Sequence, residues 1–318
     1  SVLMIRRSSS GPAMPNDNTV PMRFAKKHYN ISRLYTARDM HWLNYSCRAF
    51  VAGSDQLWNP YLEQYSGAEY YLSFVNDKNL KLSYATSFGG SDEMPPEYIG
   101  KYKHYLERFD GITVREDYAV KICDQSFGLN ALQVCDPIFL CDKARYEALA
   151  DMSERKLPER YILNFLLDPN DEKVDAYRFV QKSLGIAEVV NLTDLQDVAR
   201  RVERFGTDGA YGDAEIEDFV KAYKEAAFVI TDSFHGTCLA VILNKPFIAI
   251  VNKQRGEKRF VSLMNWLGLN ERFVFDIDEI YHNAELMSFH GFEKANEIIR
   301  QGQIQGCHWL QRMLEKAV

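Results

Sequence analysis

The sequence predicts an α/β protein of two domains, and three observations support this prediction. The chain has 318 residues, which exceeds the usual size of a single domain. Short apolar segments alternate with helix-prone segments along most of the chain, as expected for strands and helices around a parallel sheet. Residues Phe228–Ile250, FVITDSFHGTCLAVILNKPFIAI, contain a complete strand–helix–strand unit. We place the boundary in the charged segment 142–160 and expect domains at residues 1–150 and 151–318.

Composition narrows the functional class. The apolar fraction of 46% and the charged fraction of 26% are ordinary for a soluble globular protein. The net charge of -6 provides no basic field, so we expect no nucleic-acid partner. The six cysteines lie far apart without a C-x-x-C pair, which is typical of reduced thiols. Because no metal-ligand spacing, signal peptide or membrane-spanning segment is visible, we predict a cytoplasmic protein without a metal.

The strand–helix–strand unit contains a candidate anion site. Phe228–Thr231 is apolar and rich in β-forming residues, and Asp232 and Ser233 after it are common helix caps. His235 and Gly236 then fall in the first helical turn, where unpaired backbone N–H groups favour an anion. In the alternative interpretation, Asp232 or Ser233 only caps the helix and His235 is an ordinary surface histidine. For an isolated motif the two interpretations have about equal weight.

Several predicted strands of the first half end in polar residues. The four segments are Gly53-Ser54-Asp55-Gln56, Ser87-Phe88-Gly89-Gly90, Arg115-Glu116 and Asp136-Pro137. In a parallel sheet the carboxyl ends of the strands meet at one edge. A ligand-binding edge is therefore favoured over a series of unrelated turns.

The remaining segments continue the α/β pattern. We predict helices over residues 95–109, 118–126, 215–225 and 285–316, and strands over residues 161–167, 188–191 and 247–251. The basic segment 253–259 follows the last of these strands. It is either a solvated loop, the usual case for a run of charges, or an anion clamp that uses Arg255 and Arg259.

Seven segments together resemble one family. In chain order they are FVAGSDQLWNP, LSYATSFGG, ITVREDYAV, VCDPIFL, YILNFLLD, TDSFHGTCLAVILNKPFIAI and RGEKRFVSLMNWLGLNERF. This set, which runs from Phe50 to Phe273, resembles the polysaccharide pyruvyl transferase family. The family is similar in architecture to GT-B glycosyltransferases, so the resemblance implies two Rossmann-like domains that face each other across a cleft.

The resemblance also implies an activity. Characterised members transfer pyruvate from phosphoenolpyruvate to a sugar and form a cyclic ketal in polysaccharide biosynthesis. It implies phosphoenolpyruvate as donor substrate, a saccharide or lipid-linked oligosaccharide as acceptor, and no cofactor. A lipid-linked acceptor would bring the protein to a membrane surface as a peripheral protein. The N-terminal domain would bind the acceptor and the C-terminal domain the donor.

Two departures from the family pattern stand out. Many relatives carry R-x-H where this chain has Ser233-Phe234-His235, so an arginine for phosphoenolpyruvate is missing. The family's opening strand, N-Y-G loop and following helix have no counterpart, and Val2–Ile5 resembles the second strand of that scheme. We therefore expect the first strand and helix to be missing from the N-terminal domain.

These patterns assign roles to individual residues. His235 is the predicted catalytic acid–base group, because an unperturbed imidazole titrates near ~6.5. Predicted donor-binding residues are Arg115, Ser233, Gly236, Thr237, Arg255 and Arg259. Predicted acceptor-binding residues are Ser54, Asp55, Gln56 and Ser87. An exposed pair with Glu116 or Asp117 is an equally weighted alternative for Arg115.

Two other functional classes stay open at this point. A GT-B-type glycosyltransferase would place the diphosphate of a nucleotide sugar at the helix that starts near His235. A non-catalytic relative would bind glycans without turnover, and the missing arginine favours it. Binding of phosphoenolpyruvate separates both classes from a pyruvyl transferase.

Overall fold

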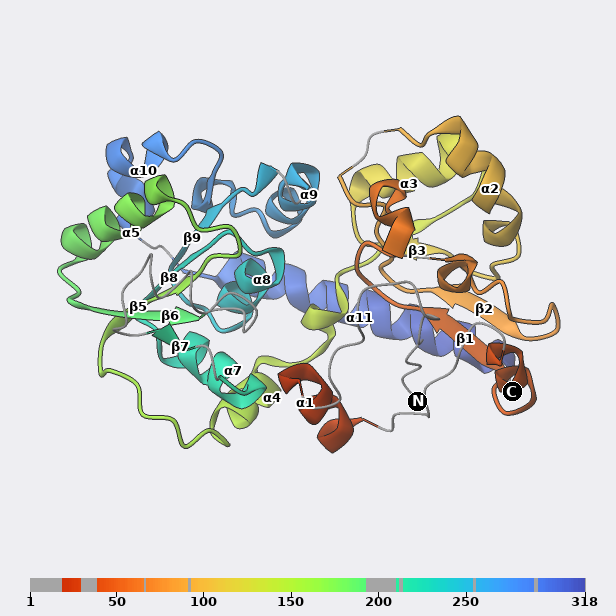
Figure 1. Ribbon diagram of the computed structural model, residues 1–318, viewed down its shortest axis with the longest axis horizontal. Helices are drawn as coiled ribbons and strands as arrows, with labels where there is room; N and C mark the ends of the chain where they lie inside the picture. Colours follow the sequence, from red (N-terminus) through yellow and green to blue (C-terminus); the bar gives the residue numbers. More distant parts are fainter. Residues whose placement is uncertain are drawn as a thin grey trace. The chain divides into compact units, whose positions relative to one another are not determined.

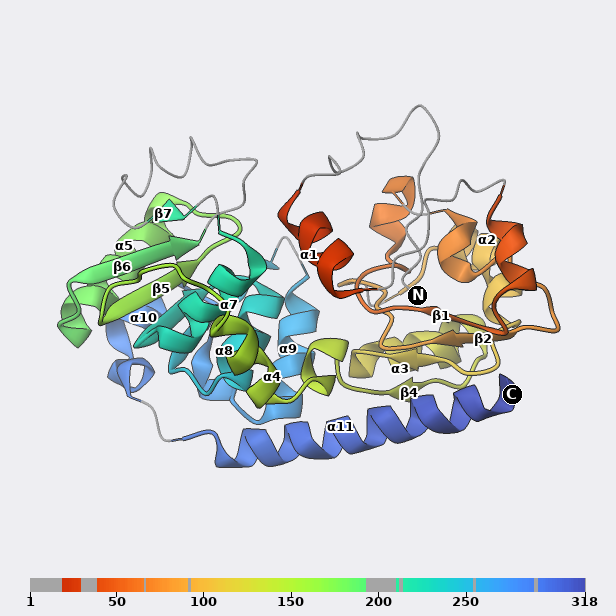
Figure 2. The same ribbon diagram turned by 90° about the horizontal axis from the view of Figure 1, so that it is seen from below.

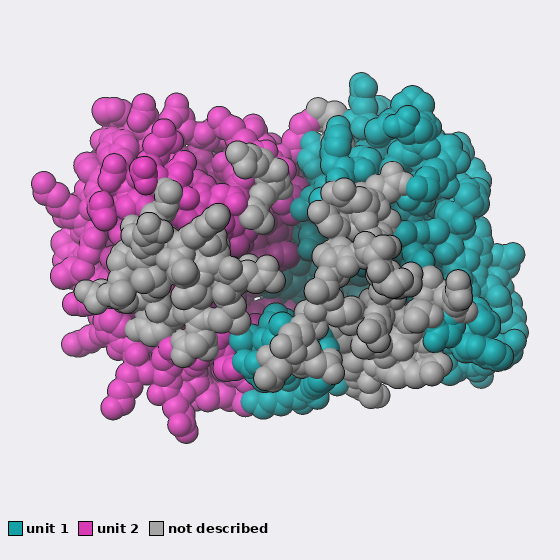
Figure 3. Space-filling view, viewed as in Figure 1, with its two compact units in different colours: residues 1–140, 300–318 teal, residues 141–299 magenta. Residues whose placement is uncertain are grey.

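The chain divides into two compact units in the computed structural model: unit 1 consists of residues 1–140 and 300–318, and unit 2 of residues 141–299 (Figure 3). The structure describes residues 19–29, 39–65, 67–90, 93–192, 210–211, 214–253, 256–288 and 291–317. The strand predicted at Val2–Ile5 and the side chain of Arg255 lie outside these residues.

Helices and strands alternate along both units (Figure 1). The strands are β1 (Ala49–Ala52), β2 (Leu80–Ser83), β3 (Thr113–Val114), β4 (Leu132–Gln133), β5 (Tyr161–Phe165), β6 (Glu188–Leu192), β7 (Ala210–Tyr211), β8 (Phe228–Thr231), β9 (Phe247–Ile250) and β10 (Phe273–Val274). The α-helices are α1 (Val20–His28), α2 (Pro96–Leu106), α3 (Asp117–Ile122), α4 (Lys143–Ala150), α5 (Asp171–Leu184), α7 (Ile216–Glu225), α8 (Phe234–Ile242), α9 (Glu257–Leu267), α10 (Asp278–His282) and α11 (Glu293–Leu314). Among the described residues, no helix is long and apolar enough to cross a membrane.

Unit 1 contains a small parallel sheet. Strand β1 pairs with β2, and β3 pairs with β4, each in parallel. Bridges from Leu82 to Gly111 and from Thr86 to Val114 place β2 beside β3. All four strands therefore run in one direction, and their carboxyl ends lie at one edge of the sheet.

Two different layers cover this sheet. Helices α2 and α3 contribute an aromatic core with buried Tyr98, Tyr102 and Ile122. The C-terminal part of α11 runs along this sheet (Figure 2). Its Trp309 and Met313 pack in one cluster with Leu80 and Leu82 of β2. Gly306 permits this approach, because a Cβ atom there would lie 2.2 Å from the hydroxyl oxygen of Tyr84.

Unit 2 is built on a six-stranded parallel sheet in the order β10-β9-β8-β5-β6-β7. Strands β8 and β9 are buried along their whole length, which confirms the strands predicted from the apolar runs on either side of α8. The chain proceeds from β5 to β6 and β7 and then returns to β8 on the other side of β5. The strand order therefore reverses between β5 and β8, where open α/β sheets bind their ligands.

The compact units differ from the expected domains 1–150 and 151–318 in two places. Helix α4 belongs to unit 2, because it packs against α7. Residues 300–318 belong to unit 1, because this part of α11 covers the sheet of that unit.

Candidate functional site

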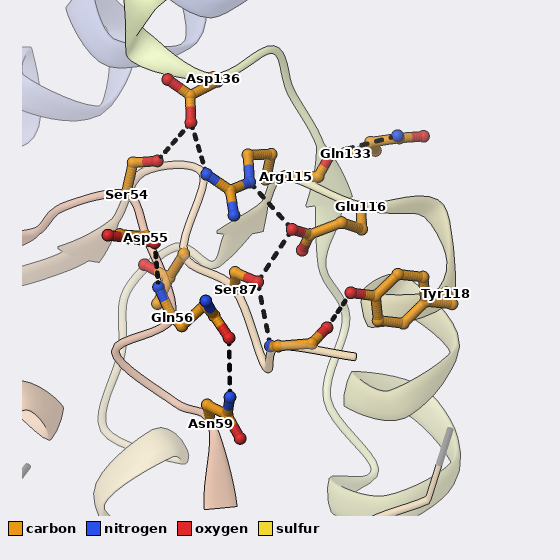
Figure 4. A network of polar contacts seen from close by, with 12 residues as sticks. Ser54, Asp55, Gln56, Asn59, Ser87, Arg115, Glu116, Tyr118, Gln133 and Asp136 are labelled. Carbon is orange, nitrogen blue, oxygen red and sulfur yellow. Dashed lines mark hydrogen bonds and ion pairs between the residues drawn. The ribbon is translucent and has the colours of Figure 1, made fainter. Parts of the chain in front are cut away.

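The polar residues predicted at the strand ends of unit 1 lie together. Figure 4 shows Ser54, Ser87 and Arg115 in one network of contacts with Glu116 and Asp136. The five residues follow β1, β2, β3 and β4 and converge because these parallel strands end at one edge. The predicted convergence of the strand ends is therefore confirmed, and ligand binding at this edge stays a prediction.

Arg115 is the centre of this network. Its Nε atom donates to Oε1 of Glu116 at 2.9 Å, and its Nη1 atom donates to Oδ2 of Asp136 at 2.7 Å. Ser87 donates its hydroxyl to the same Glu116 oxygen at 2.8 Å, and Ser54 donates to the same Asp136 oxygen at 2.8 Å. Arg115 is only 5% exposed, and both carboxylates are buried. The exposed ion pair considered for Arg115 is therefore replaced by a buried one.

Electrostatics explains how a charged guanidinium stays in this position. Burial lowers the pKa of Arg115, but the adjacent Glu116 and Asp136 carboxylates outweigh that effect and raise the pKa above its ordinary value. An unpaired buried guanidinium would cost several kcal/mol in desolvation, roughly. With both carboxylates ionised, two negative charges face one positive charge. An anionic ligand at this edge would therefore need further positive charge from elsewhere.

Asp55 and Gln56, predicted to contact the acceptor, occupy the turn after β1. Asp55 is exposed and has a φ of 80°, a left-handed conformation that aspartate tolerates better than most residues. Its Oδ1 accepts from the backbone N–H of Gln56 at 2.9 Å, and its carbonyl accepts from the N–H of Ser87 at 2.9 Å. Gln56 accepts from the side-chain amide of Asn59 at 2.7 Å. Asp55 thus joins the β1 and β2 ends and keeps its carboxylate near solvent.

No role was predicted for Asp136, and Glu116 was considered only as an exposed partner of Arg115. Both residues lie in the polar strand ends Arg115-Glu116 and Asp136-Pro137 that were predicted from the sequence. The position of Glu116 and Asp136 at the carboxyl edge of the sheet was the signal from which their role could have been predicted. An arginine at such an edge needs carboxylate partners once it is buried.

In unit 2, Asp232 ties together the two strands that flank the point of reversal. Its carboxylate accepts from the backbone N–H groups of Leu167 and Asp168, at 2.5 and 3.1 Å, after β5. It also accepts from Nζ of Lys173 at 2.7 Å, and Lys173 donates to the carbonyl of Asp168 at 2.8 Å. Asp232 is 1% exposed. Asp232 therefore stabilises the loop after β5. Lys173 was not predicted from the sequence as the partner of Asp232.

Ser233 is the N-terminal cap of α8, as one of the two interpretations predicted. The hydroxyl of Ser233 accepts from the N–H of Gly236 at 3.2 Å, and its carbonyl accepts from both the N–H and the hydroxyl of Thr237 at 2.9 Å. A Cβ atom on Gly236 would lie 2.6 Å from Oγ1 of Thr231 and 2.7 Å from the hydroxyl oxygen of Tyr223. Capping and packing thus explain Ser233, Gly236 and Thr237.

His235 and Arg259 are the two remaining predicted site residues of unit 2 whose side chains the structure describes. His235 is exposed at the first turn of α8. Arg259, from α9, is 6% exposed, and its guanidinium carbon lies 5.7 Å from the ring centroid of Phe234. Because Phe234 begins α8, Arg259 brings a cation next to the residue that precedes His235. Arg259 is one of the predicted donor-binding residues, and that role stays a prediction.

The structure shows no sign of a metal centre in its described part. No group of three or more histidine, cysteine, aspartate or glutamate side chains with metal-binding potential occurs there. No disulfide joins the six cysteines, all of which the structure describes.

The family follows from a comparison with known sequences. A family model for polysaccharide pyruvyl transferase matches residues 6–254, well over half of the chain. The chain belongs to the polysaccharide pyruvyl transferase family. Membership supports a transferase that acts on a saccharide acceptor in polysaccharide biosynthesis. Among curated proteins, no sequence matches this chain.

Solved structures support the fold. UDP-N-acetylglucosamine 2-epimerase from Rickettsia bellii aligns over 99% of this chain and 88% of its own, with 11% identity and a TM-score of 0.54. Anabaena HepE, solved with UDP and glucose, aligns over 92% of this chain and 88% of its own, with 8% identity and a TM-score of 0.50. This chain thus has the expected GT-B-like α/β fold, and at these identities the likeness is limited to fold.

Proposed function

We propose that the protein transfers pyruvate from phosphoenolpyruvate to a saccharide acceptor and forms a pyruvyl ketal. The proposal depends on the position of His235 in the fold. It is exposed at the start of α8, beside the point where the strand order of unit 2 reverses, in a chain of the pyruvyl transferase family. A histidine side chain can both give and accept a proton, as the proposed reaction requires.

The donor carries a carboxylate and a phosphate, so its binding needs more than the end of a helix. A helix N-terminus stabilises an anion by roughly 0.3–1 kcal/mol, or ~2 when partly buried. In α8 the N–H of Gly236 is already taken by Ser233, which weakens that contribution. A charge-assisted hydrogen bond adds about 1.5–3 kcal/mol, and arginine can make two in parallel. We therefore propose Arg259 as a donor-binding residue of unit 2 and the fixed guanidinium of Arg115 as an anion-binding group of unit 1.

The chemistry balances without a cofactor. His235 gives a proton to the terminal enol carbon, which becomes the methyl group, and the adjacent carbon becomes electrophilic. One sugar hydroxyl attacks that carbon and loses its proton, and the carbon–oxygen bond to phosphate then breaks. Phosphate leaves with the bonding electrons, and a second hydroxyl closes the ketal. Of the two hydroxyl protons released, one restores His235 and the other leaves with hydrogen phosphate.

Acceptor binding is assigned to the turn after β1. The exposed carboxylate of Asp55 accepts hydrogen bonds from sugar hydroxyls, and the side chain of Gln56 contributes beside it. Ser54 and Ser87, predicted as direct contacts, donate to Asp136 and Glu116 instead. They support this edge of the sheet from behind.

The test separates binding from turnover. Calorimetry of the full chain against phosphoenolpyruvate and against nucleotide sugars identifies the donor, and NMR detects the new ketal methyl signal on acceptor glycans. We expect His235→Ala to retain most of the donor affinity and to lose roughly 10²–10⁴-fold in turnover. His104→Ala, an exposed histidine of α2, is the matched control and should behave as wild type.

Three results would redirect the assignment. Binding of a nucleotide sugar without binding of phosphoenolpyruvate would indicate glycosyl transfer. Binding of glycans alone would indicate a non-catalytic relative. Full turnover by His235→Ala would remove the histidine from the mechanism.

A further inference from the structure

Glu116 and Asp136 both form ion pairs with Arg115, and charge alone does not explain why an anion-binding arginine has these partners. Their negative charges offset the positive charge of the guanidinium, and this opposes the binding of an anionic donor. If Arg115 acted only as a source of positive charge, Glu116 and Asp136 would weaken it. Their contacts with the guanidinium therefore suggest a different role.

The geometry of these contacts is that of a clamp. Glu116 holds Nε and Asp136 holds Nη1, so two different nitrogens of the guanidinium are fixed from two strand ends. Two fixed points on a planar group define its orientation, which one carboxylate at one nitrogen would leave free to rotate. The clamp itself is also held, because Ser87 and Ser54 each donate to one of the carboxylates at 2.8 Å.

A further contact fixes Asp136. Its second oxygen, Oδ1, accepts from the backbone N–H of Ile138 at 2.9 Å. Asp136 therefore uses one oxygen for the local backbone and the other for Arg115 and Ser54. The ends of all four strands of unit 1 thus contribute to the position of one guanidinium.

We propose that Glu116 and Asp136 are positioning residues that hold the Arg115 guanidinium in its binding orientation. That the bound group is the anionic donor rests on the proposed function. An arginine side chain carries about 2 kcal/mol of rotamer entropy. The clamp removes this freedom during folding instead of during binding, which leaves more of the contact energy for the ligand.

Conservative substitutions distinguish this role from a purely electrostatic one. Asp136→Asn and Glu116→Gln remove the charge and keep the shape of each side chain. If positioning dominates, phosphoenolpyruvate binds at least tenfold more weakly to both variants. If charge alone dominates, the donor binds more tightly, because a repelling carboxylate has gone. Tighter or unchanged donor binding would overturn the proposal.

The control is a carboxylate–arginine pair on the surface of the same unit. Asp77 pairs with Arg108 at 3.0 Å, and its side chain is 90% exposed. Asp77→Asn should leave donor affinity unchanged. If Asp136→Asn fails to fold, Ser54→Ala and Ser87→Ala loosen the clamp from outside and should weaken donor binding by about two- to fivefold; unchanged affinity in both would overturn the proposal.

NMR of arginine side chains tests the clamp without reference to activity. The Nε–H signal of Arg115, identified by its loss in Arg115→Lys, should be sharp and slow to exchange in the wild-type chain. It should broaden or exchange rapidly in Glu116→Gln and Asp136→Asn. If the wild-type chain binds no phosphoenolpyruvate, the proposed function fails, and this signal still decides the clamp. An unchanged signal in both variants would show that neither carboxylate positions Arg115.

Discussion

Gly236→Ala is expected to destabilise unit 2, although alanine usually stabilises a helix. An added Cβ would lie 2.6 Å from Oγ1 of Thr231, 2.7 Å from the hydroxyl oxygen of Tyr223 and 3.0 Å from Cδ1 of Phe165. Thr231 and Tyr223 are fully buried, so neither can move into solvent. Overpacking of this kind costs up to about 3 kcal/mol, and the helix propensity of alanine returns about 1 kcal/mol. The expected net loss is about 2 kcal/mol in the free energy of unfolding.

Scanning calorimetry and hydrogen exchange of the α8 amides measure this loss. A change of 1 kcal/mol shifts the unfolding temperature of a domain of this size by about 2–4 °C, so we expect a decrease of about 4–8 °C. Gly100→Ala is the matched control, because a Cβ on that exposed glycine of α2 meets no heavy atom within 4 Å. The control should stabilise unit 1 by about 0.5–1 kcal/mol. If Gly236→Ala unfolds at or above the wild-type temperature, the close packing deduced for α8 is refuted.

Three further predictions concern unit 2. Ser233→Ala should lower the free energy of unfolding by about 1 kcal/mol in chemical denaturation, because the N–H of Gly236 loses its acceptor; no change would exclude the cap. Arg259→Leu should weaken phosphoenolpyruvate binding in calorimetry by about tenfold or more, whereas Arg178→Leu on the exposed side of α5 should not. Burial raises the pKa of Asp218, but hydrogen bonds from Ser153, Arg155 and the Glu215 N–H outweigh it and lower the pKa. Because the folded pKa lies below the unfolded value of ~3.9, the carboxylate stabilises the fold above that pH, and this stability is lost as the pH falls through the folded pKa. The difference in unfolding temperature between wild type and Asp218→Asn should therefore be full at about pH 6 and vanish at strongly acid pH; a constant difference would contradict this.

The elements around α8 could be predicted because their signals are local. A buried apolar run gave β8, Ser233 marked the start of the helix, and Pro246 marked its end. Strands β3 and β4, which precede the predicted polar ends Arg115-Glu116 and Asp136-Pro137, contain only two residues each. Their pairing is limited to two residues on each strand, and an apolar pattern does not reveal how far a ladder of backbone hydrogen bonds extends.

The location of the candidate site could be predicted from the sequence, but its side-chain contacts could not. Strand order brings polar turns to one edge, so Ser54, Ser87 and Arg115 could be grouped from the sequence. That Asp136 lies 2.7 Å from Arg115 depends on the register of β3 and β4, which the sequence alone leaves open. The same limit applies to Lys173, whose approach to Asp232 depends on how α5 packs against the sheet.

The last part of α11 has a consequence for how this chain folds during synthesis. Domains usually fold in the order in which they leave the ribosome. Here the sheet of unit 1 is covered by Trp309 and Met313, from the end of the chain, while residues 141–299 form unit 2 without a break. Unit 2 can therefore complete its core during translation, whereas the first 140 residues must wait with one face of their sheet exposed. In that interval Leu82 and Val134 lack the part of their apolar cluster that Trp309 and Met313 supply.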